Sequence, residues 1–369
     1  MASAVKERRK TRFRATPSRL EVNLRAIPVL PASGWRLLSA REVALAGAVP
    51  KDYLAYGLPR RWTNEEPEQD PLLIATSGFI AKKGRFSASA RECVTEEVIS
   101  KIGAMLPVKM AKSRLVRIPE SGGLGTARRG KAHAVRFLSR DFVDRRRYEL
   151  RHGMELAAAY FDTTAEDVAS TFGLGDKGKE RDFYTVDNVL EILNAVYPDV
   201  QNLGGPSRLE TGLAKMLTFD AFVGAPDRHA MNWGVLAPVE PGGPGPRFAP
   251  LFDTARGLFG DHSDADLLAK SAKFGRKRFV ERYAERSRPI LGIDGGSRVS
   301  HFDLVAWIAN ERRDILLPGI REVLGAVRLA DIEFMLQRRF RRIITQVRIG
   351  FIMELLEVRL TRLARAIKR

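Results

Sequence analysis

The sequence predicts an α+β protein with two lobes, a small strand-rich N-terminal lobe and a large helical C-terminal lobe. Strand patterns and one amphipathic helix fall within residues 71–144, whereas helical spacing dominates residues 145–369. A chain of 369 residues is long enough for two such lobes. Residues 1–70 begin with a basic stretch and are expected to form an N-terminal arm and extension.

The composition fits a soluble globular protein and removes several classes of site. Hydrophobic residues make up 44% of the chain and charged residues 29%. Cys93 is the only cysteine, which excludes an internal disulfide and a zinc site built from several cysteines. No apolar run reaches the ~20 residues that a membrane-spanning helix needs. The basic N-terminus lacks the apolar segment of a secretory signal. We therefore expect a cytoplasmic protein without a membrane span.

The net charge of +18 is concentrated at the two ends of the chain. Residues 1–26 hold eight Arg or Lys against two Glu, and residues 338–369 hold ten against two. Positive charge of this density attracts polyanions such as nucleic acid, an acidic protein or anionic lipid. Nucleic-acid binding through the basic termini is one expectation, and a solvated basic surface without a partner is the alternative.

The first strand pattern covers residues 71–84. It predicts a strand, a turn at Ser77 and Gly78, and a second strand that ends at Lys82. A lysine in this place could bind phosphates as a point charge, or it could simply face solvent at the end of a strand. Lys83 is the rival, because the period of two places it on the opposite face of the strand.

The next segment, residues 92–106, predicts an amphipathic helix. Its apolar residues fall on one helical stripe: Val94, Val98, Ile102, Met105 and Leu106. Glu96 and Glu97 lie away from the centre of that stripe, where a solvated glutamate is the simplest interpretation.

Two further strands are predicted at residues 114–118 and 134–138, with a glycine-rich segment between them. The run from Gly125 to Ala132 is one residue short of a phosphate-binding P-loop. Ala132 has no hydroxyl for a metal ion, and a strand follows instead of a helix. We therefore interpret this segment as a hairpin loop.

From Arg145 onward the spacing is mainly helical. The predicted helices lie within residues 148–160, 186–196, 209–222, 265–274, 278–286, 302–312, 316–327 and 329–369. No internal repeat is evident, so the segments are expected to pack as one helical lobe.

Residues 217–258 carry the residue types of a phosphoryl-transfer site. Asp227 is followed five positions later by Asn232, and Asp253 ends the next strand-like segment. The first carboxylate can orient or deprotonate a hydroxyl, while an amide oxygen and a second carboxylate are hard ligands for Mg²⁺ on nucleotide phosphates. The helix and strands that flank the stretch favour catalysis over simple helix capping. His229 is expected to orient the loop by hydrogen bonds and not to act as the base.

The stretch FDAFVGAPDRHAMNWGVL, followed by APLFDTARGL, resembles the HipA-like serine/threonine kinases. Its DRHxxN run also resembles the phosphoinositide kinases. The clear resemblance covers about a fifth of the chain. It implies a bilobal protein-kinase-like fold, use of ATP and Mg²⁺, and phosphorylation of Ser or Thr on a protein substrate. It also implies a toxin-like role and a DNA-binding antitoxin partner.

The resemblance assigns roles in the N-terminal lobe as well. Lys82 would contact the nucleotide phosphates and pair with a glutamate on the helix at residues 92–106. Similarity to the family favours Glu96 for that pairing, while helical spacing alone does not separate it from Glu97.

The remaining implied contacts concern nucleotide and metal. Ser77 and Gly78 would cover the phosphates, and Phe137 belongs to the segment whose backbone would meet adenine. Asn232 and Asp253 would hold Mg²⁺.

Two other functions stay open from the sequence. A lipid or small-molecule kinase would share the DRHxxN run. A polyanion-binding protein built on a kinase scaffold would bind Mg²⁺ and ATP without turnover.

Overall fold

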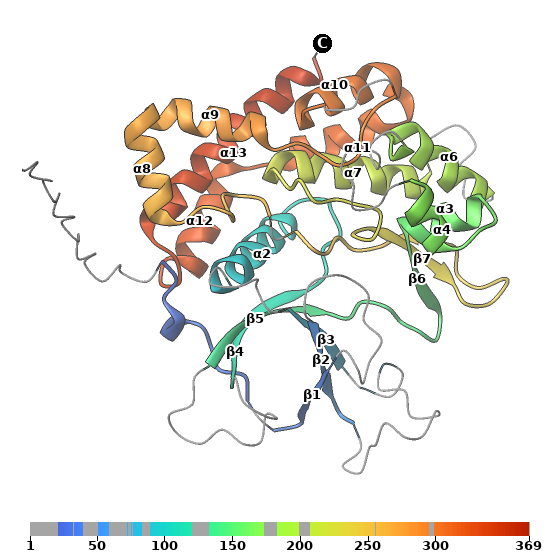
Figure 1. The fold of residues 1–369 in the computed structure, drawn as a ribbon, viewed down its shortest axis with the longest axis horizontal. Helices are drawn as coiled ribbons and strands as arrows, with labels where there is room; N and C mark the ends of the chain where they lie inside the picture. The colour runs from blue at the N-terminus through green and yellow to red at the C-terminus, as the bar shows by residue number, and fades with distance from the viewer. Residues whose placement is uncertain are drawn as a thin grey trace, which may run out of the picture.

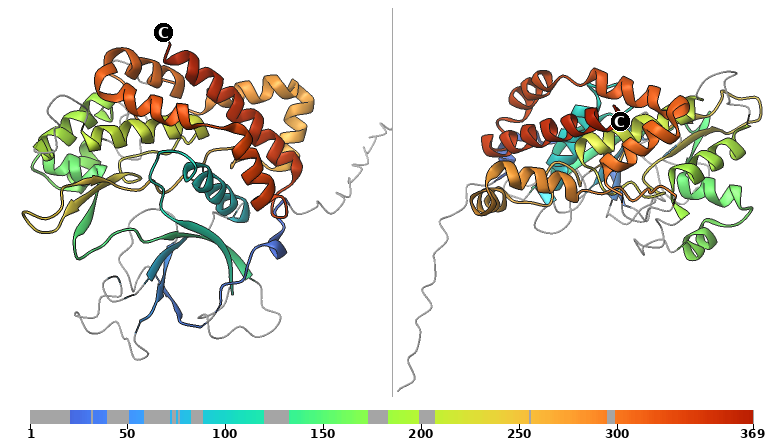
Figure 2. Two further views of the ribbon diagram at one scale, coloured as in Figure 1. Left: turned by 180° about the vertical axis from the view of Figure 1, so that it is seen from behind. Right: turned by 90° about the horizontal axis from the view of Figure 1, so that it is seen from above.

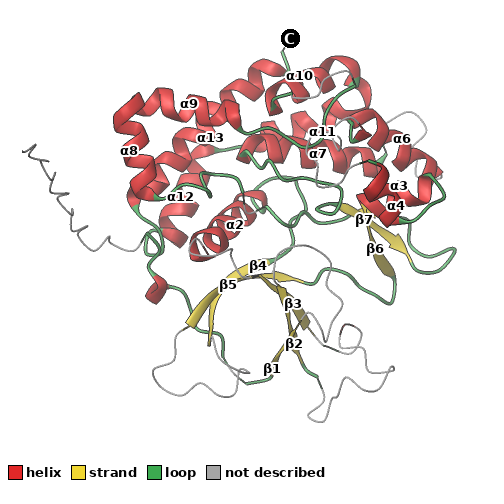
Figure 3. Ribbon diagram, in the orientation of Figure 1, coloured by secondary structure: helices red, strands yellow, loops and turns green. Residues whose placement is uncertain are grey.

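The computed structural model has two lobes, with a sheet at one end of the molecule and most helices at the other (Figure 1). It describes residues 21–31, 33–39, 51–58, 72, 75, 77–82, 89–119, 133–172, 183–198, 207–254, 256–294 and 299–368. Helix α2 (Ser89–Gly103) lies between the sheet and the other helices, and a second view from behind gives the same arrangement (Figure 2). The five-stranded sheet lies in one lobe with α2 packed on it, and a smaller three-stranded sheet lies among the helices of the other lobe (Figure 3).

The N-terminal lobe contains η1 (Leu24–Ala26), β1 (Trp35–Ser39), β2 (Lys51–Tyr56), β3 (Ser77–Lys82), α2, β4 (Ser113–Pro119) and β5 (His133–Arg140). The helical lobe contains β6 (Tyr148–His152), α3 (Gly153–Tyr160), α4 (Ala165–Thr171), α6 (Val186–Val196), α7 (Arg208–Val223), β7 (Gly234–Pro238), β8 (Arg247–Phe248), α8 (Asp264–Phe274), α9 (Arg276–Arg286), α10 (His301–Glu311), α11 (Arg313–Ala326), α12 (Leu329–Phe340) and α13 (Gln346–Ala366).

The N-terminal lobe is built on a five-stranded antiparallel sheet in the order β1-β2-β3-β5-β4. Two of its strands, β1 and β2, lie before residue 71, so the boundary predicted there is wrong. Each is five or six residues long, too short to show a period by itself. Pairing with β3 is what makes these segments strands.

The predicted turn at Ser77 and Gly78 is also wrong, because both residues lie in strand β3 and pair with β2. Their partners in β2 are Tyr56 and Ala55. A Cβ atom added at Gly78 would lie 1.7 Å from the Tyr53 hydroxyl, so this glycine makes room for a tyrosine on the neighbouring strand.

Helix α2 packs against β4 and β5. Val94, Val98 and Ile102 are buried on this contact, as the apolar stripe predicts. The helix begins and ends three residues earlier than the predicted bounds. Glu96 and Glu97 are buried too, at 3% and 5% exposed, so neither is the solvated glutamate of the simplest interpretation.

Helix α7 forms the centre of the helical lobe and packs against α10, α11 and α13. A capping box between Ser207 and Glu210 begins it. It ends at Gly224, whose φ of +71° is the left-handed conformation that glycine adopts at helix ends. The chain therefore leaves α7 at a fixed angle, three residues before Asp227.

The small sheet β6-β7-β8 lies at one side of this lobe. Residues 148–152 form its first strand, although their spacing predicted helix, because they pair with β7. The predicted last helix is divided into α12 and α13, and Thr345 caps the start of α13. The other predicted helices are present with small shifts at their ends.

Residues 21–31 connect the two lobes. The Asn23 N–H donates to the Ile343 carbonyl in the helical lobe, and the Leu30 N–H donates to the Arg117 carbonyl in the sheet. Residues 1–20, Lys83 and the glycine-rich run at residues 121–132 lie outside the described part of the chain. None of the described helices is both long and apolar enough to cross a bilayer.

The basic C-terminal segment is helical and partly internal. Arg348 and Arg359 of α13 are 3% and 0% exposed. These two charges are therefore not available to a polyanion, which reduces the surface charge that the sequence assigned to this end.

Candidate active site

Lys82 and Glu96 meet between the sheet and α2. The Lys82 Nζ atom lies 2.7 Å from Glu96 Oε1. Glu97 instead pairs with Lys101 on its own helix at 3.0 Å. The structure thus separates the two glutamates that helical spacing left equivalent, and it brings Lys82 to Glu96 as predicted.

Asp253 completes this cluster from the other lobe. Its Oδ1 atom lies 3.1 Å from Lys82 Nζ, and its side chain is 21% exposed. The backbone of Asp253 has a φ of +57°, an unusual value for a residue other than glycine. Hydrogen bonds from the Leu251 N–H to the Lys109 carbonyl and from the Ala111 N–H to the Leu251 carbonyl fix the segment just before it.

Lys82 attracts both carboxylates of this cluster, whereas the two carboxylates repel each other. Burial would lower the pKa of the Lys82 ammonium, but Asp253 and Glu96 outweigh burial and raise that pKa above its ordinary value. Burial raises the pKa of Glu96, the charge of Lys82 opposes this rise, and the charge of Asp253 adds to it. Lys82 is therefore a fixed cation at neutral pH, placed at the junction of the lobes.

Asp227 and Asn232 lie on the loop that follows α7. The Asn232 Nδ2 atom donates to the Asp227 carbonyl at 2.7 Å, so the amide oxygen of Asn232 is not used in closing the loop. The Asp227 carboxylate is 26% exposed and lies 3.3 Å from the half-exposed Arg256 guanidinium. A hydroxyl group from another molecule can therefore reach this carboxylate from solvent.

Arg228 joins the two halves of the motif, and sequence reasoning missed it. Its guanidinium binds both carboxylate oxygens of Asp220 at 2.8 Å. Its Nη1 atom donates to the Asn232 carbonyl at 2.6 Å and to the Phe252 carbonyl at 2.7 Å. Burial would lower the pKa of Arg228, but Asp220 outweighs it and keeps the pKa raised.

The buried Arg228 side chain thus binds two backbone carbonyls through one nitrogen, that of Asn232 and that of Phe252, the residue before Asp253. The only sequence signal for this role was a charged residue, Asp220, inside an apolar helix.

His229 takes a local position. Its Nδ1 atom accepts a hydrogen bond from the Met231 N–H at 3.2 Å, which fits the predicted part in orienting the loop.

Phe137 lies in the middle of β5, opposite Lys82, with its ring 5.7 Å from the Lys82 Nζ atom. Its side chain is 3% exposed and belongs to the core beneath α2. The chain crosses between the lobes after β5, beyond Arg140, so Phe137 precedes the crossing and its ring supports Lys82.

Ser77 and Gly78 begin β3, whereas Lys82 ends it. The strand ends that flank Lys82 are those of β1 and β2, because Lys51 pairs with Lys82 and Ser39 pairs with Asp52. Ser77 and Gly78 therefore lie at the opposite end of β3 from Lys82.

The donor set fits Mg²⁺. Asp253 offers a carboxylate and Asn232 an amide oxygen, and Mg²⁺ is commonly held by one or two such side chains together with substrate phosphates. The described residues contain no group of three His, Cys, Asp or Glu that would form a metal site of protein ligands alone. A metal shared with a nucleotide is the arrangement that these oxygens allow.

A groove of about 750 Å³ opens beside this loop, lined in part by Pro226 and Arg256. Most of the charged side chains in its described lining are basic. The cations are Arg256, Lys270, Lys273, Arg282 and Arg286, against the acids Glu92 and Asp261. The groove therefore places positively charged side chains beside Asp227, with Arg256 in contact with its carboxylate.

No protein-family model matches this sequence, and no curated protein matches it in sequence. Among solved structures, the proinflammatory kinase CtkA of Helicobacter pylori is similar, with a TM-score of 0.59 and 16% identity over 87% of this chain and 96% of that chain. The HipA toxin of Shewanella oneidensis, solved with HipB and operator DNA, gives a TM-score of 0.43 and 12% identity over 91% of this chain and 73% of that chain. The similarity to CtkA confirms the predicted fold, and the chain has the two-lobed architecture of a kinase.

Proposed function

We propose that this protein is an ATP- and Mg²⁺-dependent kinase that transfers the γ-phosphoryl group to a Ser or Thr hydroxyl of a protein. The observation that carries the proposal is the contact of Lys82 with both Glu96 and Asp253. Three elements from two lobes converge there on one buried ammonium. A purely structural ion pair would not need a second carboxylate that stays partly exposed to solvent.

Each residue has a task that follows from its place. Lys82 neutralises nucleotide phosphate charge, and Glu96 holds Lys82 in position. Asn232 and Asp253 would hold Mg²⁺, which when bound would neutralise charge on the transferred phosphoryl group. Asp227 orients the acceptor hydroxyl and takes its proton.

The reaction is then a displacement at phosphorus. The hydroxyl oxygen of the acceptor forms a bond to the γ-phosphorus while the bond to the bridging oxygen breaks. ADP leaves, and the proton of the hydroxyl moves to the Asp227 carboxylate. Arg256 lies on that carboxylate at 3.3 Å, and an entering hydroxyl replaces this contact. Positioning and charge neutralisation carry most of the rate in such chemistry.

The groove beside Asp227 supports a macromolecular acceptor. A groove of about 750 Å³ has the volume to hold a short peptide segment, and its basic side chains favour acidic residues near the acceptor hydroxyl. A lipid or small-molecule acceptor is the second candidate, from the DRHxxN run.

A direct test incubates the protein with ATP labelled on the γ-phosphate, Mg²⁺ and a cell lysate, and then identifies the labelled species. We expect label on Ser or Thr of protein, with none transferred by Asp227→Asn. Label in the lipid fraction would favour the second candidate. Binding of Mg²⁺ and ATP without any transfer would favour a non-catalytic scaffold.

The toxin-like role and the DNA-binding antitoxin partner are proposed from the sequence resemblance alone. Co-purification of the tagged protein from its native cells tests the partner. A bound DNA-binding protein would support this proposal, and its absence would oppose it without affecting the kinase assay.

A further inference from the structure

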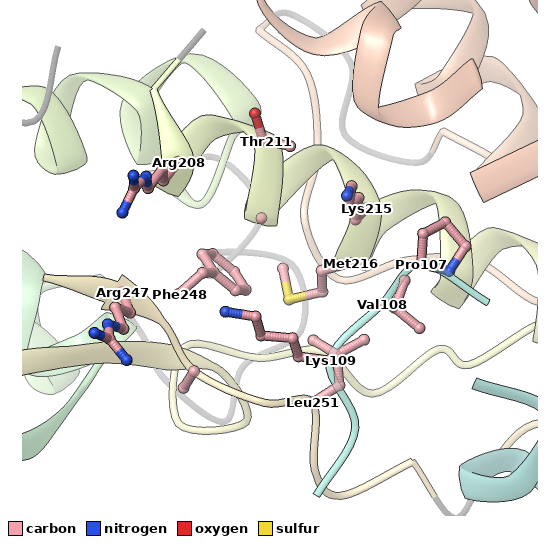
Figure 4. Close-up of a pocket in the computed structure, with 12 residues that line it drawn as sticks. Pro107, Val108, Lys109, Arg208, Thr211, Lys215, Met216, Arg247, Phe248 and Leu251 are labelled. Atoms are coloured by element: carbon pink, nitrogen blue, oxygen red, sulfur yellow. The ribbon is translucent and has the colours of Figure 1, made fainter. Parts of the chain in front are cut away.

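A second cavity, of about 460 Å³, lies between α7, β8 and residues 107–109 (Figure 4). Its lining residues on α7 are Arg208, Thr211, Gly212, Lys215 and Met216. They recur at the spacing of one helix face, so a single face of α7 forms one wall. Among the described residues, this cavity shares no lining residue with the Lys82 cluster or with the groove beside Asp227.

The floor of the cavity is apolar. Phe248, Met216, Val108 and Leu251 line it, and all four are at most 9% exposed. The Phe248 ring packs close to α7, because a Cβ atom at Gly212 would lie 2.4 Å from it. The floor is therefore a preformed apolar surface.

The rim is cationic. Lys109, Arg208, Lys215 and Arg247 line the cavity, and no acidic residue is among its described lining. Figure 4 shows Arg208 and Arg247 on opposite walls near Phe248, with the Lys109 ammonium pointing toward the same ring. These three cations come from three separate segments and lie around one end of the cavity.

The pairing of these cations differs. Lys215 binds Glu322 at 2.7 Å, so its charge is already compensated. Arg247 lies over the Tyr148 ring, 5.2 Å from its centroid, a contact that brings no negative charge. At the end of the cavity lined by Lys109, Arg208 and Arg247, a ligand can therefore bind positive charge beside an apolar floor.

We propose that this cavity binds a phosphorylated small molecule with an apolar body, at a site separate from the nucleotide site. Guanidinium groups match phosphate oxygens with paired hydrogen bonds, and two exposed arginines, Arg208 and Arg247, line this end of the cavity. The apolar floor accepts a ring or a short alkyl chain. The volume lies within the range of small-molecule sites.

The test measures binding of naphthyl phosphate by calorimetry, with uncharged naphthol as the matched probe. We expect the phosphate to bind at least about tenfold more tightly than naphthol, because charge-assisted hydrogen bonds form only with the phosphate. Arg208→Gln and Arg247→Gln should each weaken phosphate binding about tenfold and leave naphthol binding unchanged. Both side chains are exposed, so these variants should fold like the parent.

Two control variants fix the location. Arg339→Gln removes an exposed arginine of α12, and Lys82→Met removes the cation of the nucleotide site; both should bind naphthyl phosphate like the parent. Equal binding of phosphate and naphthol, no binding of the phosphate, or loss of binding only in Lys82→Met would each overturn the proposal. A parallel titration with hexyl phosphate then distinguishes a ring from an alkyl chain as the preferred body.

Discussion

Arg228 and Lys82 are both buried cations paired with carboxylates, but the two clusters differ in their exposure to solvent. Arg228 and Asp220 have side chains that are each 3% exposed, and Arg228 makes four hydrogen bonds to the protein. Lys82 is also buried, but its partner Asp253 has a side chain that is 21% exposed. One cluster is closed by the protein itself, and the other keeps a carboxylate open to solvent.

The two clusters also differ in which lobes they join. Arg228 and its partners Asp220, Asn232 and Phe252 all belong to the helical lobe. These contacts therefore do not depend on how the two lobes are placed relative to each other. Lys82 reaches across the lobes to Asp253, and a ligand between the lobes can compete for both groups. The closed cluster fixes the loop after α7, and under the proposed function the open cluster would bind nucleotide and metal.

The largest expected effect is on the closed cluster. Arg228→Gln leaves Asp220 as an uncompensated buried charge and frees two backbone carbonyls, so the free energy of unfolding should fall by about 3–5 kcal/mol. Urea denaturation measures this loss. Arg339→Gln, on the surface of α12, is the matched control and should change stability by less than about 0.5 kcal/mol. A stable, well-folded Arg228→Gln protein would remove the distinction between the clusters.

The open cluster should lose less stability and more activity. The sequence left open that Lys82 faces solvent, but it is 6% exposed and paired, so Lys82→Met has a stability cost. We expect about 1–2 kcal/mol, because Glu96, with its raised pKa, can take up a proton instead of remaining charged. Phosphoryl transfer should fall on the order of hundredfold or more.

The double variant Lys82→Met/Glu96→Gln sharpens this prediction. It should recover stability relative to Lys82→Met without recovering activity. Recovery of both would mean that the Lys82 charge has no catalytic part.

A smaller effect concerns pH. The folded pKa of Glu96 is raised above its ordinary 4.5, so the folded protein holds this proton more firmly than the unfolded chain does. Its contribution to stability is present below about pH 4.5 and is lost as the pH rises through the folded pKa. Glu96→Gln cannot lose the proton, so its stability relative to the parent should increase with pH across that window, by at most about 1.4 kcal/mol per pH unit.

Thermal unfolding of both proteins between pH 4 and pH 8 checks this slope. A stability difference that moves in the opposite direction would mean that the pairing with Lys82 outweighs the burial of Glu96.

The sequence located what is local and missed what depends on distant partners. Asp227, Asn232 and Asp253 lie in one short stretch, so local spacing alone could suggest roles for them. Arg228 was not recognised because its meaning depends on Asp220, one helix earlier, and on a carbonyl that precedes Asp253. The solvated interpretation of Lys82 failed for the same reason, since only α2 and the other lobe bury it.

Secondary structure follows the same rule. Long helices with their own caps and apolar faces, such as α6 and α7, were predicted nearly to the residue. Short strands were predicted less well. The strands predicted at residues 114–118 and 134–138 are present as β4 and β5, whereas β1 and β2 fell in the range assigned to an arm, and β6 was assigned to a helix. Pairing partners far along the chain decide these segments, and spacing within five residues carries too little information.

Under the proposed function, Asp253 holds the metal on the nucleotide while Asp227 acts on the acceptor hydroxyl. Calorimetric titration of Mg²⁺–ATP into the parent, Asp227→Asn and Asp253→Asn tests it most directly. We expect Asp227→Asn to bind Mg²⁺–ATP within about threefold of the parent, and Asp253→Asn to bind at least about tenfold more weakly, because only the second loses a charged metal ligand. Weak binding by Asp227→Asn with parent-like binding by Asp253→Asn, or parent-like binding by both, would contradict the account.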